Sequence, residues 1–456
     1  MSSYRRAAIH RRICALLLYI TYSAPTYAFT ILPATATGSS RRTADASSSL
    51  LLLSSSPSGG DAAAADDDTT ISTSSSDPEQ QQDQQPNAVR APLKYVGPYP
   101  CLALRFPRLA TSAQRGRNVT GISLDFVLDT AANTNTLNGQ VAQELQLEVV
   151  GEALPGVGAA GSIAGGDTYL LGDCQLDYGV TMEGTSSSSA NMADNDDGKK
   201  DKKDATVDVG EFIFMQGLTA SALPVASPAA AGLLGLYFFN CFGGVMFEWG
   251  CNSNSNSNSA ASSLAIPSVT FFSDRNKMGN ALDGLVRAPI KPLPVSALPS
   301  INIVINGQKI PALLDTGSPI TVLNAEAAKM AGVTTAMEDD SENSKSSSNP
   351  FNPFAKLTKN FQSAQAAARG DVLLIAGAGG ERVELVKSKE AVECGVVGDG
   401  DAPIDIGQHS IYVGDLPGLA ALGGLGGDGA PPAAVLGMDI LRTRQRMVYR
   451  VDEVYL

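Results

Sequence analysis

Histidine is almost absent from this sequence, which contains only His10 and His409. A mechanism of the Ser-His-Asp or Cys-His type would have to use His409, because His10 lies in a leader-like segment. A metal site built from several imidazoles is excluded for the same reason. We interpret His409 as a strand residue without a catalytic role. A hydrolytic site made of carboxylates alone is compatible with this composition.

Cysteine is also sparse, and no two cysteines form a CxxC pair. Zinc ribbons and thioredoxin-like redox sites are therefore unsupported. If the N-terminal segment is removed, an odd number of scattered cysteines is left, which favours buried thiols over a disulfide framework. One bridge, between Cys241 and Cys251, stays open. The six cysteines are Cys14, Cys101, Cys174, Cys241, Cys251 and Cys394.

Basic residues are few relative to acidic ones. The chain has 33 Lys and Arg against 46 Asp and Glu, which gives a net charge of -13. Nucleic-acid binding requires basic surfaces, so we expect no nucleic-acid partner. Much of the acidic charge lies in low-complexity stretches, so it does not indicate a cationic substrate.

Long apolar runs are missing as well. The apolar segment 13–20 follows several arginines and precedes small residues up to Ala28, which is the pattern of a signal peptide. It is too short to span a membrane, which takes about 20 apolar residues. Residues 217–247 carry no charge, but Pro224 and Pro228 interrupt them. We therefore expect no membrane span in the mature chain.

The segment after residue 28 resembles the bipartite plastid presequences of algae with complex plastids. Phe29 directly follows the expected cleavage site, and residues 30–60 are rich in Ser, Thr and Ala with a single acidic residue, Asp45. We therefore predict transport to a plastid by the secretory route. Secretion or residence in the endomembrane system is the alternative.

Low-complexity tracts indicate the domain organisation. Residues 61–90 are polar and bury too little apolar area to offset the entropy of ordering, so they are predicted to be disordered. Further tracts at 185–204, 251–263 and 338–352 are interpreted as surface-loop insertions. The predicted organisation is a signal peptide (1–28), a transit-like and disordered segment (29–93), a first lobe (94–250), a linker (251–296) and a second lobe (297–456).

Between these tracts, short β-type runs are separated by glycine and proline. This pattern predicts an all-β sandwich or barrel. Two short helices are expected at 139–147 and 325–331, each at the same distance after an aspartate. The predicted strands are 101–106, 124–128, 212–215, 245–249, 301–305, 372–375, 409–413 and 447–451.

An internal repeat relates the two halves of the chain. The segment FVLDTAA at 126–132 matches ALLDTGS at 312–318, which places Asp129 and Asp315 at an offset of 186 residues. A second anchor, LLG at 233–235, matches VLG at 435–437 at an offset of 202 residues. Two anchors that recur in the same order indicate two similar halves with one aspartate each.

These residues resemble the retropepsin-like aspartic proteases. The resemblance is carried in the second half by DTGS at 315–318, TVL at 321–323 and VLGMDIL at 435–441, and in the first half by DTAA at 129–132 and LLGL at 233–236. It implies two pseudo-symmetric retropepsin-like β-barrel lobes with short helices, arranged in one chain as in bilobed pepsin-like enzymes. It also implies an endopeptidase that acts on peptide or protein substrates and uses neither a metal nor an organic cofactor. A monomer would then hold both halves of the site.

The resemblance implies that Asp129 and Asp315 are the catalytic pair. Two carboxylates so close together cannot both ionise, so they share one proton. The ionised partner would take a proton from water, and the protonated partner would polarise the scissile carbonyl. Thr130 and Thr316 would hydrogen-bond across the axis between the lobes.

The residues after these threonines, Ala131 and Gly317, are expected to bring a backbone N–H to each carboxylate. Two glycine-rich segments, 158–167 and 376–380, are candidates for flaps that close over substrate. A phosphate-binding loop is the competing reading of both segments, but neither has the required Lys or strand-helix context.

One departure from the family pattern concerns Ala131, which stands where glycine is usual. Its side chain restricts φ, which would strain or misplace Asp129. This leaves a second hypothesis, a catalytically inactive retropepsin-like module that binds peptides or scaffolds an assembly. The presence of both aspartates favours the peptidase.

Overall fold

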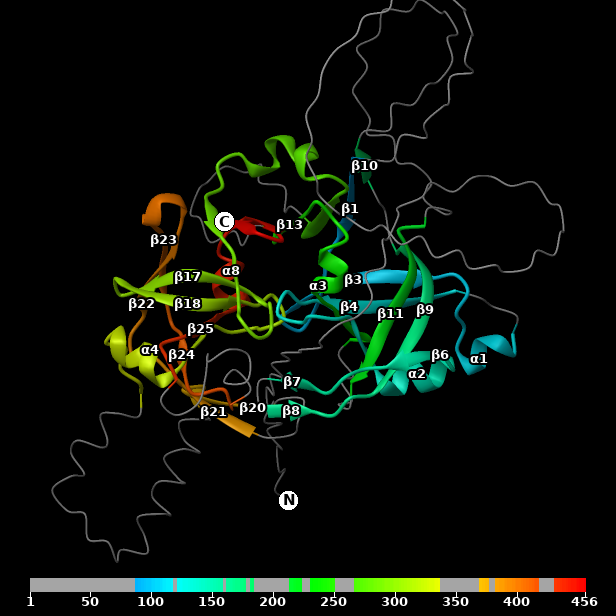
Figure 1. The fold of residues 1–456 in the computed structure, drawn as a ribbon, viewed down its shortest axis with the longest axis horizontal. Coiled ribbons are helices and arrows are strands. Elements are labelled where there is room, and N and C mark those ends of the chain that lie inside the picture. The colour runs from blue at the N-terminus through cyan, green and yellow to red at the C-terminus, as the bar shows by residue number, and fades with distance from the viewer. Residues whose placement is uncertain are drawn as a thin grey trace, which may run out of the picture.

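The computed structural model describes residues 87–117, 121–158, 161–177, 181–183, 213–223, 230–250, 266–336, 369–376, 382–417 and 430–456. The fold consists of two β-rich lobes that lie side by side and are joined by a third sheet (Figure 1). The predicted all-β fold with two lobes and short helices is confirmed. The predicted signal peptide and most of the low-complexity tracts lie outside the described residues.

The first lobe is a sheet that closes into a barrel. Its strand order is β2-β3-β4-β12-β5-β11-β9-β6, and an additional pairing between β3 and β9 closes it. Closure leaves few unpaired backbone groups at the sheet edges. The strands are β2 (Lys94–Val96), β3 (Tyr99–Phe106), β4 (Ile122–Leu128), β5 (Thr136–Asn138), β6 (Glu148–Glu152), β9 (Asp167–Leu176), β11 (Met215–Leu223) and β12 (Gly232–Leu234).

The second lobe is built from one larger sheet. Its order is β20-β21-β24-β19-β25-β18-β17-β22-β23, and β16 pairs with β17 off this path. The strands are β16 (Lys291–Pro292), β17 (Pro299–Ile305), β18 (Gln308–Leu314), β19 (Val322–Leu323), β20 (Val372–Ala376), β21 (Arg382–Lys387), β22 (Val392–Val397), β23 (Pro403–His409), β24 (Tyr412–Val413) and β25 (Ala434–Leu436).

The two lobes use the same strand pairings. In the first lobe β12 runs parallel to β4 and antiparallel to β5, and β5 runs parallel to β11. In the second lobe β25 runs parallel to β18 and antiparallel to β19, and β19 runs parallel to β24. Each aspartate therefore follows a strand in the same topological position.

A seven-stranded sheet joins the lobes, in the order β10-β1-β14-β13-β26-β27-β15. At its centre, β13 and β26 pair so that Val245 lies opposite Tyr449, Met246 opposite Val448 and Phe247 opposite Met447. At the 202-residue offset Met246 corresponds to Val448, so these two equivalent residues pair with each other. A pseudo-twofold axis therefore passes through this pair. The strands are β1 (Ala88–Pro92), β10 (Thr181–Glu183), β13 (Gly244–Glu248), β14 (Ser268–Phe272), β15 (Arg287–Pro289), β26 (Arg446–Arg450) and β27 (Glu453–Tyr455).

Helices in the described part of the chain are few and short. The predicted helices at 139–147 and 325–331 are confirmed as α2 (Gly139–Leu145) and α4 (Ala325–Met330). Both begin at an asparagine, Asn138 or Asn324, whose side chain accepts a hydrogen bond from the first turn, as N-cap residues do. The remaining helices are α1 (Ser112–Arg115), α3 (Leu236–Phe239), α8 (Met438–Leu441), η1 (Arg275–Lys277), η2 (Gly279–Leu282) and η3 (Asp399–Asp401).

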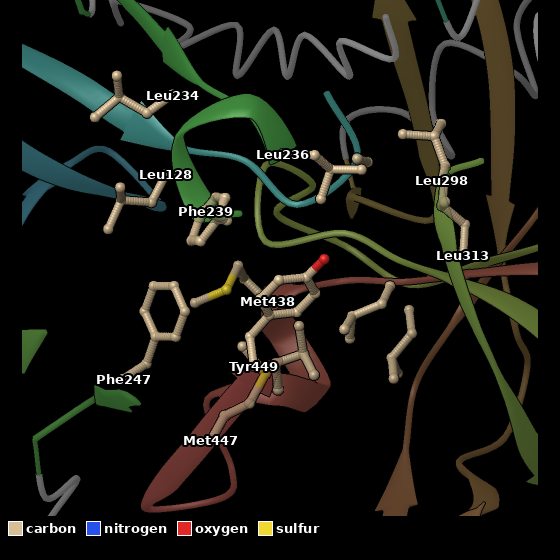
Figure 2. Close-up of a cluster of buried hydrophobic side chains, with 14 of the residues drawn as sticks. Leu128, Leu234, Leu236, Phe239, Phe247, Leu298, Leu313, Met438, Met447 and Tyr449 are labelled. Carbon is tan, nitrogen blue, oxygen red and sulfur yellow. The ribbon is translucent and has the colours of Figure 1, made fainter. Parts of the chain in front are cut away.

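The hydrophobic core runs from one lobe into the other. Figure 2 shows buried side chains of both halves packed together. The Phe239 ring lies 6.1 Å from that of Phe247 and 5.5 Å from that of Tyr449, centroid to centroid. Trp249 is buried and stacks on Phe247. Because the lobes share a core, we expect them to unfold together.

Three strands of the shared sheet lie in segments that the sequence analysis assigned to disorder or to a linker. Strand β1 contains residues of the predicted disordered segment, and β14 and β15 lie within the predicted linker at 251–296. All three pair in the shared sheet with partners far away in the sequence. Their order therefore comes from tertiary pairing and not from local composition.

The remaining expectations concern a membrane span, two strands and the cysteines. The described residues between 217 and 247 form parts of β11, β12, α3 and β13. No described helix is long and apolar enough to cross a membrane. The expected strand at 409–413 is not continuous, because β23 ends at His409 and β24 begins at Tyr412. The strand expected at 212–215 begins only at Met215, the first residue of β11. The described cysteines are free thiols, including Cys241, and three of them are buried: Cys101, Cys174 and Cys394.

Candidate active site

The two aspartates follow directly after buried strands of equivalent position. Asp129 follows β4 and Asp315 follows β18. The Asp129 N–H donates to the carbonyl of Leu234 at 3.0 Å, and the Asp315 N–H donates to that of Leu436 at 3.1 Å. The apolar-apolar-Gly strands thus hold both aspartate loops in place, as the repeat predicts.

The glycines that end these strands are required by close backbone contact. A Cβ at Gly235 would lie 2.4 Å from the carbonyl oxygen of Ala132, and one at Gly437 would lie 2.2 Å from that of Ile320. Side chains essentially never approach a backbone oxygen so closely. Any larger residue would therefore push the aspartate loop away from the strand.

Two threonines link the aspartate loops across the pseudo-twofold axis. The Thr130 N–H donates to Thr316 Oγ1, and the Thr316 N–H donates to Thr130 Oγ1, each at 3.1 Å. The Thr130 hydroxyl also donates to the carbonyl of Leu314 at 2.8 Å, and the Thr316 hydroxyl to that of Leu128 at 2.7 Å. Both threonines are fully buried, so these reciprocal bonds fix the two loops against each other.

The aspartate side chains meet at the centre of this network. A Cβ placed on Gly317 would lie 2.4 Å from Cγ of Asp129, so the carboxylate from the first lobe lies against the loop of the second. Only 1% of Asp129 and 0% of Asp315 is exposed. The structure therefore brings together the six residues predicted for the site: Asp129, Thr130, Ala131, Asp315, Thr316 and Gly317.

Burial and mutual proximity change the acidity of this pair. Burial is the main cause that raises the pKa of Asp129, and the N–H of Ala131 opposes it by donating to Oδ1 at 2.8 Å. Burial also raises the pKa of Asp315 well above its usual range, and the charge of Asp129 adds to this. The pair therefore holds a proton at pH values where an exposed aspartate is ionised.

Few hydrogen bonds reach the carboxylate oxygens. Asp129 Oδ2 and both oxygens of Asp315 have no hydrogen-bond partner among the described residues. The Ser318 hydroxyl, next in the DTGS motif, donates to the carbonyl of Ile320 at 2.7 Å instead. Its counterpart in the first lobe, Ala132, has no hydroxyl. Neither aspartate therefore accepts a hydrogen bond from a serine hydroxyl of its own loop, but the backbone N–H groups of Gly317 and Ser318 oppose the raised pKa of Asp315.

Each aspartate loop has a second support that the sequence analysis did not assign. The hydroxyl and N–H of Thr321 donate to Asp439 at 2.6 and 2.9 Å, and Thr321 Oγ1 accepts the N–H of Gly437 at 3.0 Å. In the first lobe Asn135 Oδ1 accepts the N–H of Gly235 at 3.2 Å. Asn135 and Thr321 share the 186-residue offset of the aspartates, which could have revealed this role.

Both halves carry the expected hairpin after the aspartate. Strands β6 and β9 pair antiparallel, and between them the short strands β7 (Gly156–Gly158) and β8 (Gly161–Ile163) pair at the tip. In the view of Figure 1 this tip lies between the two lobes. The corresponding strands β20 and β21 also pair, and their connection at 377–381 lies outside the described residues.

Other candidate groups lie elsewhere. His409 is in β23, where its Nε2 lies 3.3 Å from the carbonyl oxygen of Ile406. Among the residues that the structure describes, no three His, Cys, Asp or Glu side chains are grouped so that they could hold a metal ion.

Comparison with known proteins also indicates an aspartic protease. Residues 301–353 match the aspartyl protease family. The match contains Asp315 and its loop and supports an aspartic protease function for the chain. A search of curated proteins found no match.

Among solved structures, one similar chain is basic 7S globulin from soybean. It shares 9% identity, covers 81% of this chain and 95% of its own, and has a TM-score of 0.35. A similarity at this level does not by itself establish a common fold.

Proposed function

We propose that this protein is an aspartic endopeptidase in which Asp129 and Asp315 activate a water molecule for attack on a peptide bond. The main support is the reciprocal Thr130–Thr316 network, which holds one aspartate from each lobe against the other. The aspartyl protease match at residues 301–353 supports the same class. The chain would be two fused retropepsin-like copies, with lobes near 94–250 and 297–456.

The reaction uses the shared proton of the pair. Asp129, which accepts the Ala131 N–H, is the better placed to be ionised and takes a proton from the attacking water. Asp315 gives its proton to the scissile carbonyl oxygen, which forms a neutral tetrahedral gem-diol. When this intermediate collapses, one of its hydroxyl groups returns a proton to Asp315, and Asp129 passes the proton it took from water to the leaving amine. No metal or organic cofactor is needed for these steps.

A second candidate is a protease-like module that binds peptides without cleaving them. The near-complete burial of both carboxylates favours this alternative, because a peptide reaches them only after the covering segments move. The alanine at position 131, where glycine is usual in the family, also favours a module that does not cleave peptides. In the first candidate the aspartates are needed for peptide cleavage. In the second they contribute only to the structure of a peptide-binding module.

Cleavage of a mixed peptide library by the purified protein, followed by mass spectrometry, tests the proposal. Asp129→Asn and Asp315→Asn should each reduce cleavage at least 1,000-fold, as is typical when one member of a catalytic unit is lost. Asp283→Asn, at an exposed position, is the matched control and should retain activity. If either dyad variant cleaves as the wild type does, the shared-site mechanism is wrong.

A further inference from the structure

A chain of hydrogen bonds runs from Asp439 to the strand that holds Asp315. The hydroxyl of Thr321 donates to Asp439 Oδ1 at 2.6 Å and accepts the N–H of Gly437 at 3.0 Å. Gly437 directly follows Leu436, whose carbonyl accepts the N–H of Asp315 at 3.1 Å. Thr321 is completely buried, so the loss of either partner would leave a buried polar group unpaired. The chain therefore ties the backbone of Asp315 to the carboxylate of Asp439.

Both carboxylate oxygens of Asp439 take part in this support. Oδ2 accepts the N–H of Thr321 at 2.9 Å, and Oδ1 accepts the Thr321 hydroxyl and, at 2.9 Å, the N–H of Ile440. All three bonds are donated to the carboxylate. An asparagine at this position would have nearly the same shape, but its NH2 group would face a donor in place of one acceptor oxygen. The hydrogen-bond pattern therefore requires a carboxylate.

The backbone contacts of this turn are the same in the two lobes. In the second lobe the N–H of Met438, next to Asp439, donates to the carbonyl of Ser318 at 2.8 Å. In the first lobe the N–H of Leu236 donates to the carbonyl of Ala132 at 2.7 Å. Each short helix therefore binds the aspartate loop of its own lobe through an equivalent backbone bond.

The side-chain support differs between the lobes. Asn135, at the position equivalent to Thr321, also accepts a glycine N–H, that of Gly235 at 3.2 Å. Its Nδ2 donates to the carbonyl of Thr219 in β11 at 3.2 Å, whereas the Thr321 hydroxyl donates to α8. At the 202-residue offset, the residue equivalent to Asp439 is Tyr237. A carboxylate therefore supports the loop of the second lobe, and an amide supports that of the first.

We propose that Asp439 is a positioning residue of the peptidase site, which acts through Thr321 on the strand and loop that hold Asp315. The inference rests on the proposed function. When the Thr321 hydroxyl loses its acceptor, its bond to Gly437 is no longer fixed, and the Asp315 loop can shift. A displacement of about 1 Å at a reacting group can lower the rate about 100-fold. The effect falls on turnover, because the displaced group is one of the two reacting carboxylates.

Asp439→Asn tests the proposal in the full-length protein. In peptide cleavage kcat should fall about 100-fold, while KM should change by less than about threefold. Asp173→Asn in β9 is the matched control, because Asp173 is also half-buried and accepts a backbone N–H, that of Gly217 at 3.1 Å, which an amide oxygen can still accept. It should keep its kcat. An unchanged kcat in a folded Asp439→Asn variant, or an equal loss in Asp173→Asn, would overturn the role of Asp439.

A double-mutant cycle tests whether Asp439 acts through Thr321. Thr321→Val removes the hydroxyl and should lower kcat, whereas Thr321→Ser keeps the hydroxyl and should retain most of the activity. Adding Asp439→Asn to Thr321→Val should cost much less than Asp439→Asn costs alone, because both changes break the same chain. Fully additive losses in the double variant would show that Asp439 acts by another route.

Amide hydrogen exchange tests the chain without catalysis. Asp439→Asn should accelerate exchange of the Gly437 N–H by at least about tenfold and leave that of Gly235, which Asn135 holds, unchanged. Equal acceleration at both glycines, or none at Gly437, would contradict the proposed support. If the wild type cleaves no peptide at any pH, the peptidase proposal fails, while exchange at Gly437 still decides whether Asp439 supports this strand.

Discussion

Replacement of Asp129 by asparagine should stabilise the protein at neutral pH while it abolishes turnover. Asparagine has nearly the same shape and keeps an oxygen that accepts the Ala131 N–H, but it does not ionise. Burial raises the pKa of Asp129 from 3.8 to about 7 in the folded protein. The folded state therefore binds this proton more tightly than the unfolded chain does.

The sign of the effect follows from this difference. The stabilisation due to the bound proton is complete below about pH 3.8 and is lost as the pH rises through about 7. A difference of about 3 pKa units corresponds to roughly 4 kcal/mol at about 1.36 kcal/mol per unit. Relaxation around the pair makes the true contribution smaller than this upper limit. We therefore expect the change in the free energy of unfolding caused by Asp129→Asn to be more favourable at pH 8 than at pH 4 by about 2–4 kcal/mol.

Chemical denaturation of the wild type and of Asp129→Asn at pH 4 and pH 8 measures this gain. The comparison between the two pH values cancels any change in packing, because packing does not depend on pH. Asp283→Asn should show no such difference, since this side chain is exposed. Equal destabilisation of Asp129→Asn at both pH values would refute the claim that a buried, proton-sharing pair exists.

Three further predictions concern the loops and the leader. Thr130→Val should lower the free energy of unfolding by about 2–4 kcal/mol in chemical denaturation, because the carbonyl of Leu314 and a backbone N–H lose buried partners. Gly437→Ala should destabilise the fold by at least about 2 kcal/mol and abolish peptide cleavage, because its Cβ would lie 2.2 Å from the carbonyl oxygen of Ile320. A fluorescent protein fused after residues 1–93 should accumulate in the plastid, as fluorescence microscopy would show.

Each of these three predictions can be contradicted by a specific result. Thr130→Ser keeps the hydroxyl and should restore most of the stability, so an equal loss in both variants contradicts the hydrogen-bond argument. Gly151→Ala meets no atom within 4 Å and should be tolerated. If it lowers stability as much as Gly437→Ala, close contact is not the cause. Fluorescence confined to the medium or the endomembranes would favour the secretory alternative.

The positions of the aspartates could be predicted from sequence because each lies in a local, repeated pattern. An apolar strand, Asp-Thr and a later apolar-apolar-Gly strand recur in order, and the structure pairs β12 with β4 and β25 with β18 accordingly. The two helices were predictable for a similar reason, since each begins at an asparagine that can cap it.

The shared sheet could not be predicted in this way. Strand β1 pairs with β14, so that Ala88 lies opposite Phe272, and no local feature of either segment specifies a partner so distant. The composition of the surrounding tracts even suggested disorder and a linker. Strand formation there depends on the assembled lobes, which sequence composition does not describe.

The consequence of Ala131 was also outside the reach of the sequence. Ala131 was visible as a departure, but the expected consequence was strain at Asp129 in the same loop. In the structure the φ angle of Ala131 is not positive, and its N–H donates to Asp129 Oδ1 at 2.8 Å, so the expected strain is absent.

The account is tested most directly by a crystal structure of the protein with a statine-type peptide inhibitor, whose hydroxyl mimics the attacking water. We predict that this hydroxyl lies within hydrogen-bonding distance of carboxylate oxygens from both Asp129 and Asp315. An inhibitor bound away from this pair, or carboxylates too far apart to contact one hydroxyl, would contradict the proposed site.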